Sequence, residues 1–439
     1  MELRAALGLA LLCAALEAAP AGPQPRSAAG QFWHVSDLHL DPTYHITSDR
    51  TKVCSSSKGA NASNPGPFGD FLCDSPYQLI LSAFAFMKDS KEQVSFMIWT
   101  GDSPPHVPVK ELSTKLVISI IGNMSSTIRS FFPDLQVFPA LGNHDYWPQD
   151  QLPVTTSEVY NAVADFWKPW LNDEAINTFR KGGFYTQLFE SGDSSQPLRI
   201  ISLNTNLYYS PNSVTVNITD PADQFAWLEG ILETSSEKKE KVYIIGHVPI
   251  GYLPYARNTT AIREYYNERL VKIFRKYSSV IVGQFFGHTH RDSIMVLLDE
   301  EEKPVNSLFV APAVTPVKNV WQMESNNPGV RLYQYDFLDY SLLVYYFFRK
   351  IWLCAFSIWP LKMSCKTPLL FILMDLSRGC GKMDWLCGYF GHYRHPNHFH
   401  LLGIGPAPVK FLILTKIYLL AARHSVPVEK HGCHGKLQS

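Results

Sequence analysis

Five short polar clusters in this 439-residue chain contain the Asp, Asn and His side chains that proteins use to bind metal ions. Each closely follows an apolar run typical of a buried strand. They are Asp37-Leu-His39, Gly101-Asp102, Gly142-Asn143-His144-Asp145, Gly246-His247 and Gly287-His288-Thr289-His290. In open α/β sheets the functional crevice lies beyond the carboxyl ends of the strands, so we expect the five clusters to meet at one site.

These side chains are the donors expected of a metal centre that activates water. Two divalent metal ions bound side by side activate a water molecule at ordinary pH and neutralise phosphate charge. The mixed nitrogen and oxygen ligands suit zinc, with iron or manganese as alternatives. Asp37 and His39 alone would more often be a strand-end hydrogen bond or a helix cap, so the prediction depends on the whole ordered set.

The ordered set D-x-H, G-D, G-N-H-D, G-H and G-H-T-H resembles the calcineurin-like metallophosphoesterases. Residues 99–106, 140–145 and 283–290 are also similar to the acid sphingomyelinase-like phosphodiesterases. This resemblance covers roughly Gln31 to Leu342. It implies two mixed β-sheets packed as a sandwich and flanked by helices, with the active site at one edge.

The resemblance also implies a ligand set for each ion. One ion would be held by Asp37, His39 and His290. The other would be held by Asn143, His247 and His288. Asp102 would bridge both ions, because a carboxylate has two oxygens.

Three further residues are candidates for the chemical step. His144 has no metal role in the family pattern, so its imidazole is free to contact phosphate oxygens or donate a proton to the leaving group. Asp145 would orient this imidazole, with a purely structural Asp-His pair as the alternative. His106 would be a second donor, as the resemblance implies; otherwise it is a solvent-exposed loop histidine.

For the substrate, the resemblance implies nucleotides and nucleotide-linked alcohols such as CDP-choline, with sphingomyelin a poor substrate. Tyr252 is a candidate platform for stacking on a base, although such a tyrosine more often packs within its loop. We expect a monomer that takes small phosphoesters, binds no nucleic acid duplex and does not insert stably into membranes. The alternatives are a non-catalytic secreted binding protein on the same scaffold and a misfolded splice form without activity.

The N-terminal residues predict secretion. Residues 1–21 contain Arg4, an apolar stretch and then small residues, the pattern of a cleaved signal peptide. An oxidising compartment favours a disulfide between Cys54 and Cys73 over two free thiols. Four glycosylation sequons agree with this route; they begin at Asn61, Asn123, Asn217 and Asn258.

Strands alternating with helices, followed by consecutive strands, indicate an α/β fold with mixed sheets. One helix is expected after the cap-like sequence Asp74-Ser75-Pro76. Further helices are expected at about 111–131, 157–171, 220–234 and 261–277. Strands are expected at about 94–99, 137–141, 198–203, 241–246, 279–286, 293–298, 307–311 and 331–335.

The C-terminal part differs from the rest. Residues 22–342 would form the catalytic domain, whereas 343–439 carry 12 Lys/Arg but only 3 Asp/Glu and no recognisable family motif. This change is typical of an alternative exon, a retained intron or a shifted frame, and we expect a poorly ordered tail. It holds five cysteines and a histidine-rich patch at His392, His395, His398 and His400, whose spacing fits no zinc site.

Overall fold

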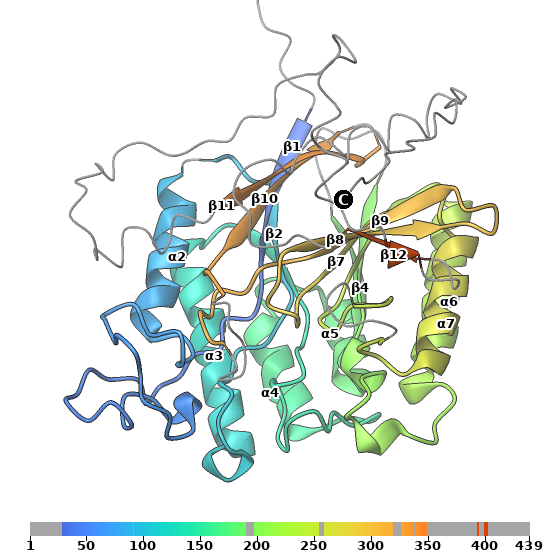
Figure 1. The fold of residues 1–439 in the computed structure, drawn as a ribbon. Helices are drawn as coiled ribbons and strands as arrows, with labels where there is room; N and C mark the ends of the chain where they lie inside the picture. Colours follow the sequence, from blue (N-terminus) through green and yellow to red (C-terminus); the bar gives the residue numbers. More distant parts are fainter. Residues whose placement is uncertain are drawn as a thin grey trace, which may run out of the picture.

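Two β-sheets lie at the centre of the structure, and helices flank them, with α2 and α3 on one side and α6 and α7 on the other (Figure 1). The computed structural model describes residues 29–348, apart from 91, 190–196, 254–258, 319–325 and 338, together with 393–394 and 399–402. The predicted α/β fold, a sandwich of two mixed sheets flanked by helices, is confirmed.

The first sheet has the strand order β11-β10-β1-β2-β3. Its strands are β1 (Ala29–Val35), β2 (Phe96–Trp99), β3 (Gln136–Pro139), β10 (Val330–Asp336) and β11 (Leu342–Phe348). β1 pairs in parallel with β2, and β2 with β3, whereas β10 runs antiparallel to both β1 and β11. The carboxyl ends of β1, β2 and β3 therefore lie at the same edge.

The second sheet has the order β12-β13-β8-β9-β7-β6-β5-β4. Its strands are β4 (Tyr185–Phe189), β5 (Leu198–Ser202), β6 (Lys241–Ile245), β7 (Ile281–Phe286), β8 (Ser293–Leu298), β9 (Pro304–Val310), β12 (Tyr393–Arg394) and β13 (Phe399–Leu402). β5, β6, β7 and β9 are parallel neighbours, so β6 and β7 also end at one edge. Both strands are almost wholly buried, as expected for parallel strands covered on both faces.

The six α-helices of the described residues connect these strands. They are α2 (Tyr77–Asp89), α3 (Thr114–Phe131), α4 (Glu158–Trp167), α5 (Asp173–Gly182), α6 (Gln224–Glu237) and α7 (Glu264–Lys276). α3 and α4 begin where Ser113 and Ser157 accept a hydrogen bond from a backbone N–H in the first turn, which satisfies one of the free donors there.

Two features of the helices differ from the sequence-based expectation. α2 begins at Tyr77 with Pro76 in the cap position, and no side chain caps it, because Asp74 is engaged elsewhere. α5 was not predicted, although its signals are present: Asn172 caps its first turn, and Gly183 ends it in the left-handed conformation. The adjoining edge strand β4 was not predicted either.

Aromatic side chains hold the two sheets together. Phe32 on β1 is fully buried and stacks on Phe96 of β2 and Tyr333 of β10, with ring centroids 4.7 and 4.8 Å away. On the facing sheet its ring meets Phe285 of β7 edge-on at 5.3 Å and lies near Tyr243 of β6 at 5.7 Å. These contacts fix the edges of the two sheets relative to each other, because close-packed rings leave no room to slide.

The C-terminal segment partly departs from expectation. β11 begins at Leu342, where the catalytic domain was expected to end, and its pairing with β10 continues the first sheet to Phe348. Further on, β13 pairs with β8 at the edge of the second sheet. The tail cysteines and His392, His395 and His398 lie outside the described residues, as do residues 1–21. No helix of the described part is long and apolar enough to span a membrane.

Candidate metal centre

All five polar clusters lie where a strand has just ended, at the edge shared by the two sheets. The first sheet supplies Asp37 and His39 after β1, Asp102 after β2, and Asn143 after β3. The second sheet supplies His247 after β6, and His288 and His290 after β7. The contacts described below join residues from both sheets, so the predicted convergence on one site is what the structure shows.

The first set of donors is Asp37, His39 and His290. Nε2 of His39 lies 3.1 Å from Nε2 of His290, and these nitrogens are 3.7 and 3.4 Å from Oδ1 of Asp37. Ligands bound tetrahedrally at about 2.1 Å from one ion are about 3.4 Å apart. The separations therefore match donors that share a metal ion.

The second set is Asn143, His247 and His288. Oδ1 of Asn143 lies 3.0 Å from Nε2 of His247 and 3.0 Å from Nδ1 of His288. Asp150 orients the amide, because its Oδ1 accepts a hydrogen bond from Nδ2 of Asn143 at 2.7 Å. Asp150 was not among the sequence candidates, and nothing in its local sequence indicates this contact.

Asp102 joins the two sets, but through one oxygen. Its Oδ2 is 3.4 Å from Nε2 of His39 and 3.1 Å from Nε2 of His247. Its Oδ1 instead accepts the backbone N–H of His144 at 2.9 Å. Asp102 therefore lies between the two sets, the position from which it would bridge both ions.

Backbone carbonyls fix the tautomers of two histidines. Nδ1 of His39 donates to the carbonyl of Pro104 at 2.7 Å, and Nδ1 of His247 donates to that of Thr100 at 2.6 Å. Each leaves Nε2 as the nitrogen that faces the cluster, the usual support for a metal-binding imidazole.

The charges around the cluster suit cations. Burial opposes ionisation of Asp37 and Asp102, but the nearby imidazoles of His290 and His247 hold the pKa of each carboxyl well below its usual range. Burial also disfavours charge on His39 and His247, yet these carboxylates raise both pKa values to about 9. Metal binding must therefore displace protons from the two imidazoles.

The backbone is strained where it carries the ligands. Asp37, His39, Asp102, His288 and His290 all have positive φ angles, between 39° and 72°. Such conformations are unfavourable for residues other than glycine and are commonly retained at functional sites. These backbone conformations direct the side chains of the five residues toward the donor cluster.

Asp145 has a different role from the one predicted. Its Oδ2 accepts the backbone N–H groups of Asp102 and Gly142, and its Oδ1 accepts that of Ser103. Asp145 makes no hydrogen bond to the His144 ring in the structure, so its predicted role of orienting that ring is wrong. It instead ties the loop after β2 to the loop after β3.

These two loops approach as closely as backbone allows. A Cβ on Gly142 would lie 1.9 Å from Oδ1 of Asp102, and one on Gly101, where φ is +87°, would lie 2.3 Å from the nitrogen of Gly142. Both positions therefore require glycine.

His144 and His106 lie beside the first set of donors. Ring centroids are 4.9 Å apart for His39 and His144, 4.1 Å for His39 and His106, and 4.3 Å for His106 and His144. Nδ1 of His144 is buried and has no partner among the described residues. Burial, and then His106, keep the pKa of His144 well below its usual range. His106 is 29% exposed and contacts Asp74, so it belongs to the cluster rather than to the solvent.

The aromatic candidate is less open than predicted. Tyr252 is only 4% exposed, and its hydroxyl lies 3.4 Å from Oε1 of Glu264. Stacking on a base would need an open ring face, so this role stays a prediction. Tyr209, missed from the sequence, lies nearer the donors, with its ring 4.8 Å from that of His288 and partly exposed.

The predicted disulfide between Cys54 and Cys73 is confirmed. The sequon residues Asn61, Asn123 and Asn217 are exposed, and Asn258 lies outside the described residues.

The donor chemistry fits two divalent ions. Three groups of His and Asp donors, each within 4.8 Å, occur among the described residues, and Asp102 belongs to two of them. They are His39 with His106 and His290, His39 with Asp102 and His144, and Asp37 with Asp102 and His247. Imidazole with carboxylate is the set expected for zinc, iron or manganese.

Comparison with known proteins agrees with this site. The calcineurin-like phosphoesterase family model matches residues 30–292, and the acid sphingomyelin phosphodiesterase C-terminal region matches residues 303–352. Human "Cyclic GMP-AMP phosphodiesterase SMPDL3A" is 71% identical over 329 residues, which cover 75% of this chain and 72% of that protein. Human "Acid sphingomyelinase-like phosphodiesterase 3b" is 42% identical over 327 residues, 73% of this chain and 71% of that protein.

Among solved structures, one titled "Structure of PhoD" is similar with a TM-score of 0.41 and 10% identity over 74% of this chain and 72% of that one.

The first match spans more than half of the chain, which therefore belongs to the calcineurin-like phosphoesterases. Within this class it is a member of the acid sphingomyelinase-like phosphodiesterase 3 family, whose members are metal-dependent phosphodiesterases. The predicted family is thus confirmed. The match to the C-terminal region ends at residue 352, close to the predicted end of the resemblance near Leu342.

Replacing Gly142 tests whether the close approach of the two loops holds the metal centre. Gly142→Ala would push a methyl group into the Asp102 carboxylate, so we expect the loss of most bound divalent metal, measured by elemental analysis of the purified protein. Gly230→Ala is the matched control, because nothing lies within 4 Å of its added Cβ in α6, and it should keep its metal. Full metal occupancy in Gly142→Ala would contradict this account.

Proposed function

We propose that this protein is a secreted, zinc-dependent phosphodiesterase that hydrolyses phosphate ester or anhydride bonds of nucleotides and nucleotide-linked alcohols. The observation that carries the proposal is the meeting of both donor sets at Oδ2 of Asp102. One human relative is named a cyclic GMP-AMP phosphodiesterase, so a cyclic dinucleotide joins ATP and CDP-choline as a candidate substrate.

The residues divide the chemical work. When bound, a pair of divalent ions supplies a water molecule of lowered pKa and neutralises phosphate charge. The carboxylates of Asp37 and Asp102 provide the negative charge that retains such ions. His144 lies at the edge of the donors with an unpaired buried Nδ1, a group that costs stability unless a ligand satisfies it. A phosphate oxygen or the leaving oxygen of the substrate is the partner that we assign to the His144 ring.

A substrate panel tests the proposal. Protein stripped by a chelator should be inactive, and zinc should restore hydrolysis of cyclic GMP-AMP, ATP and CDP-choline, measured by chromatography of the products. Sphingomyelin in detergent should remain nearly inert, as the resemblance to the 3A-type phosphodiesterases implies. Asp102→Asn serves as the inactive control, because it weakens both donor sets. Preferred turnover of sphingomyelin, or full activity of Asp102→Asn, would refute the proposal.

The proton-donor role of His144 has its own test. His144→Gln should retain metal and lower turnover on the order of a hundredfold for a substrate with a poor leaving group, a loss typical of general-acid catalysis. A substrate with an activated leaving group needs less protonation and should lose less. Equal losses for both substrates would assign His144 to charge stabilisation instead.

Secretion is supported by the Cys54–Cys73 disulfide and by the exposed sequon residues Asn61, Asn123 and Asn217. We expect glycosylated protein in the medium of expressing animal cells, detected by a mobility shift after glycosidase treatment. Retention of all the protein inside the cells, without glycans, would contradict this part of the proposal.

A further inference from the structure

Asp74 is a buried carboxylate that the function described so far does not use. It is fully inaccessible to solvent, and it lies two residues before the N-cap of α2 without capping that helix. Its Oδ2 accepts the backbone N–H of His106 at 2.6 Å. Both carboxylate oxygens are also 3.1 Å from Nδ1 of His106.

This contact determines which nitrogen of His106 is available. An ionised carboxylate only accepts hydrogen bonds, so Nδ1 of His106 must carry the proton that faces Asp74. Nε2 is then the nitrogen left for a ligand. The centroid of the His106 ring lies 4.3 Å from that of His144 and 4.1 Å from that of His39. The backbone and side-chain contacts together hold both the position and the rotation of the imidazole.

We propose that Asp74 is the positioning residue for His106, orienting its Nε2 toward the substrate phosphate beside His144. This inference rests on the hydrolytic function proposed above and deepens it, because it names the residue that fixes the orientation of His106. Asp74 touches no reacting atom and acts through His106.

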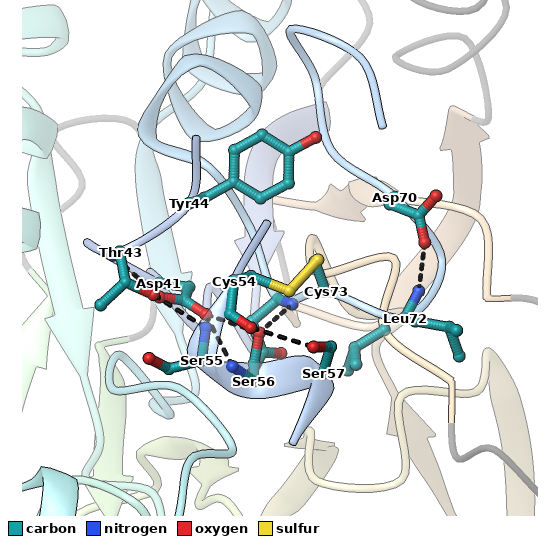
Figure 2. Close-up of a disulfide and its surroundings, with 12 residues drawn as sticks. Asp41, Thr43, Tyr44, Cys54, Ser55, Ser56, Ser57, Asp70, Leu72 and Cys73 are labelled. Atoms are coloured by element: carbon teal, nitrogen blue, oxygen red, sulfur yellow. Dashed lines mark hydrogen bonds between the residues drawn. A yellow bond between two sulfur atoms is a disulfide. The ribbon is translucent and has the colours of Figure 1, made fainter. Parts of the chain in front are cut away.

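The surroundings of Asp74 hold it rigidly. Thr315 donates its hydroxyl hydrogen to Oδ1 of Asp74 at 2.9 Å, and the backbone N–H of Asp74 donates to Oγ of Ser56 at 2.8 Å. The Ser56 hydroxyl in turn donates to Oδ2 of Asp41 at 2.6 Å. Figure 2 shows Asp41 linked to Ser56 and Thr43 beside the disulfide.

The disulfide loop therefore has a link to the active site. Cys73 directly precedes Asp74. Its bond to Cys54 holds this end of the loop against η1 (Ser55–Ser57), which contains Ser56. A loop closed in this way gives the carboxylate few alternative positions, so the imidazole is oriented before substrate binds.

The test is a double-mutant cycle with Asp74→Asn and His106→Gln. Asparagine keeps the volume of Asp74 but removes its charge and one acceptor oxygen. We expect kcat for a nucleotide diester with a poor leaving group to fall about 10- to 100-fold, the range for residues that orient a functional imidazole. KM and metal content should change little. The kcat for a diester with an activated leaving group should fall much less than the kcat for a diester with a poor one. In the His106→Gln background, Asp74→Asn should cause no further loss.

Asp70→Asn is the matched control, because this buried carboxylate holds the same disulfide loop through the backbone N–H groups of Asn64 and Leu72 and bonds to neither Asp74 nor His106. It should lower the melting temperature while keeping the wild-type ratio between poor and activated leaving groups. If Asp74→Asn does not fold, Thr315→Val removes a hydrogen bond to Asp74 and should give a smaller loss of the same kind. That loss should also vanish in the His106→Gln background.

Different outcomes refute different claims. Equal losses from Asp74→Asn with and without His106 would show that Asp74 acts only on the fold, and the inference would fail. Loss of bound metal in Asp74→Asn or His106→Gln would make His106 a metal ligand and would also overturn it. Absence of diester hydrolysis by the metal-loaded wild-type enzyme would instead refute the proposed function itself.

Discussion

The ionised carboxylate of Asp102, buried between two sets of donors, is the constraint on which the arrangement of the site depends. A charge removed from water needs close partners of opposite charge and well-directed hydrogen bonds. Asp102 finds them in His39 from one sheet, in His247 from the other and in the backbone N–H of His144. No single sheet could supply all three, so the site exists only at the edge where the two sheets meet.

The packing of the sheets makes that meeting reproducible. Phe32 stacks within its own sheet and contacts Phe285 and Tyr243 on the other. These contacts lie a few residues before the strands end and the metal-binding residues follow. Tight aromatic packing fixes β1 and β7, and with them the positions of Asp37 and His288 just beyond these strands. The two strand ends lie close enough for the backbone N–H of His288 to donate to the Asp37 carboxylate at 3.1 Å.

Carboxylates near the site fall into two groups. Asp37 and Asp102 face the donor cluster, where their ionised form suits bound cations. Asp74, Asp145 and Asp150 instead hold an imidazole, two loops and an amide in place. The hydrogen bonds of this second group help the loops to keep the unfavourable positive φ angles of the ligand residues. Each such bond limits the ways in which a loop can relax.

The local sequence was sufficient for the strand ends, most helices, the disulfide and the polar residues that meet at the edge of the two sheets, since these depend on periodicity, capping, cysteine context and motifs a few residues long. It failed for the edge strand β4, for β11 and for the roles of Asp145 and Asp74. Asp145 adjoins His144 in sequence, yet it binds N–H groups of a loop more than 40 residues away, and Asp74 resembles a helix cap, yet it binds His106. A carboxylate binds whichever donors the folded chain brings within reach, and those donors come from segments whose proximity is set by the packing of the two sheets.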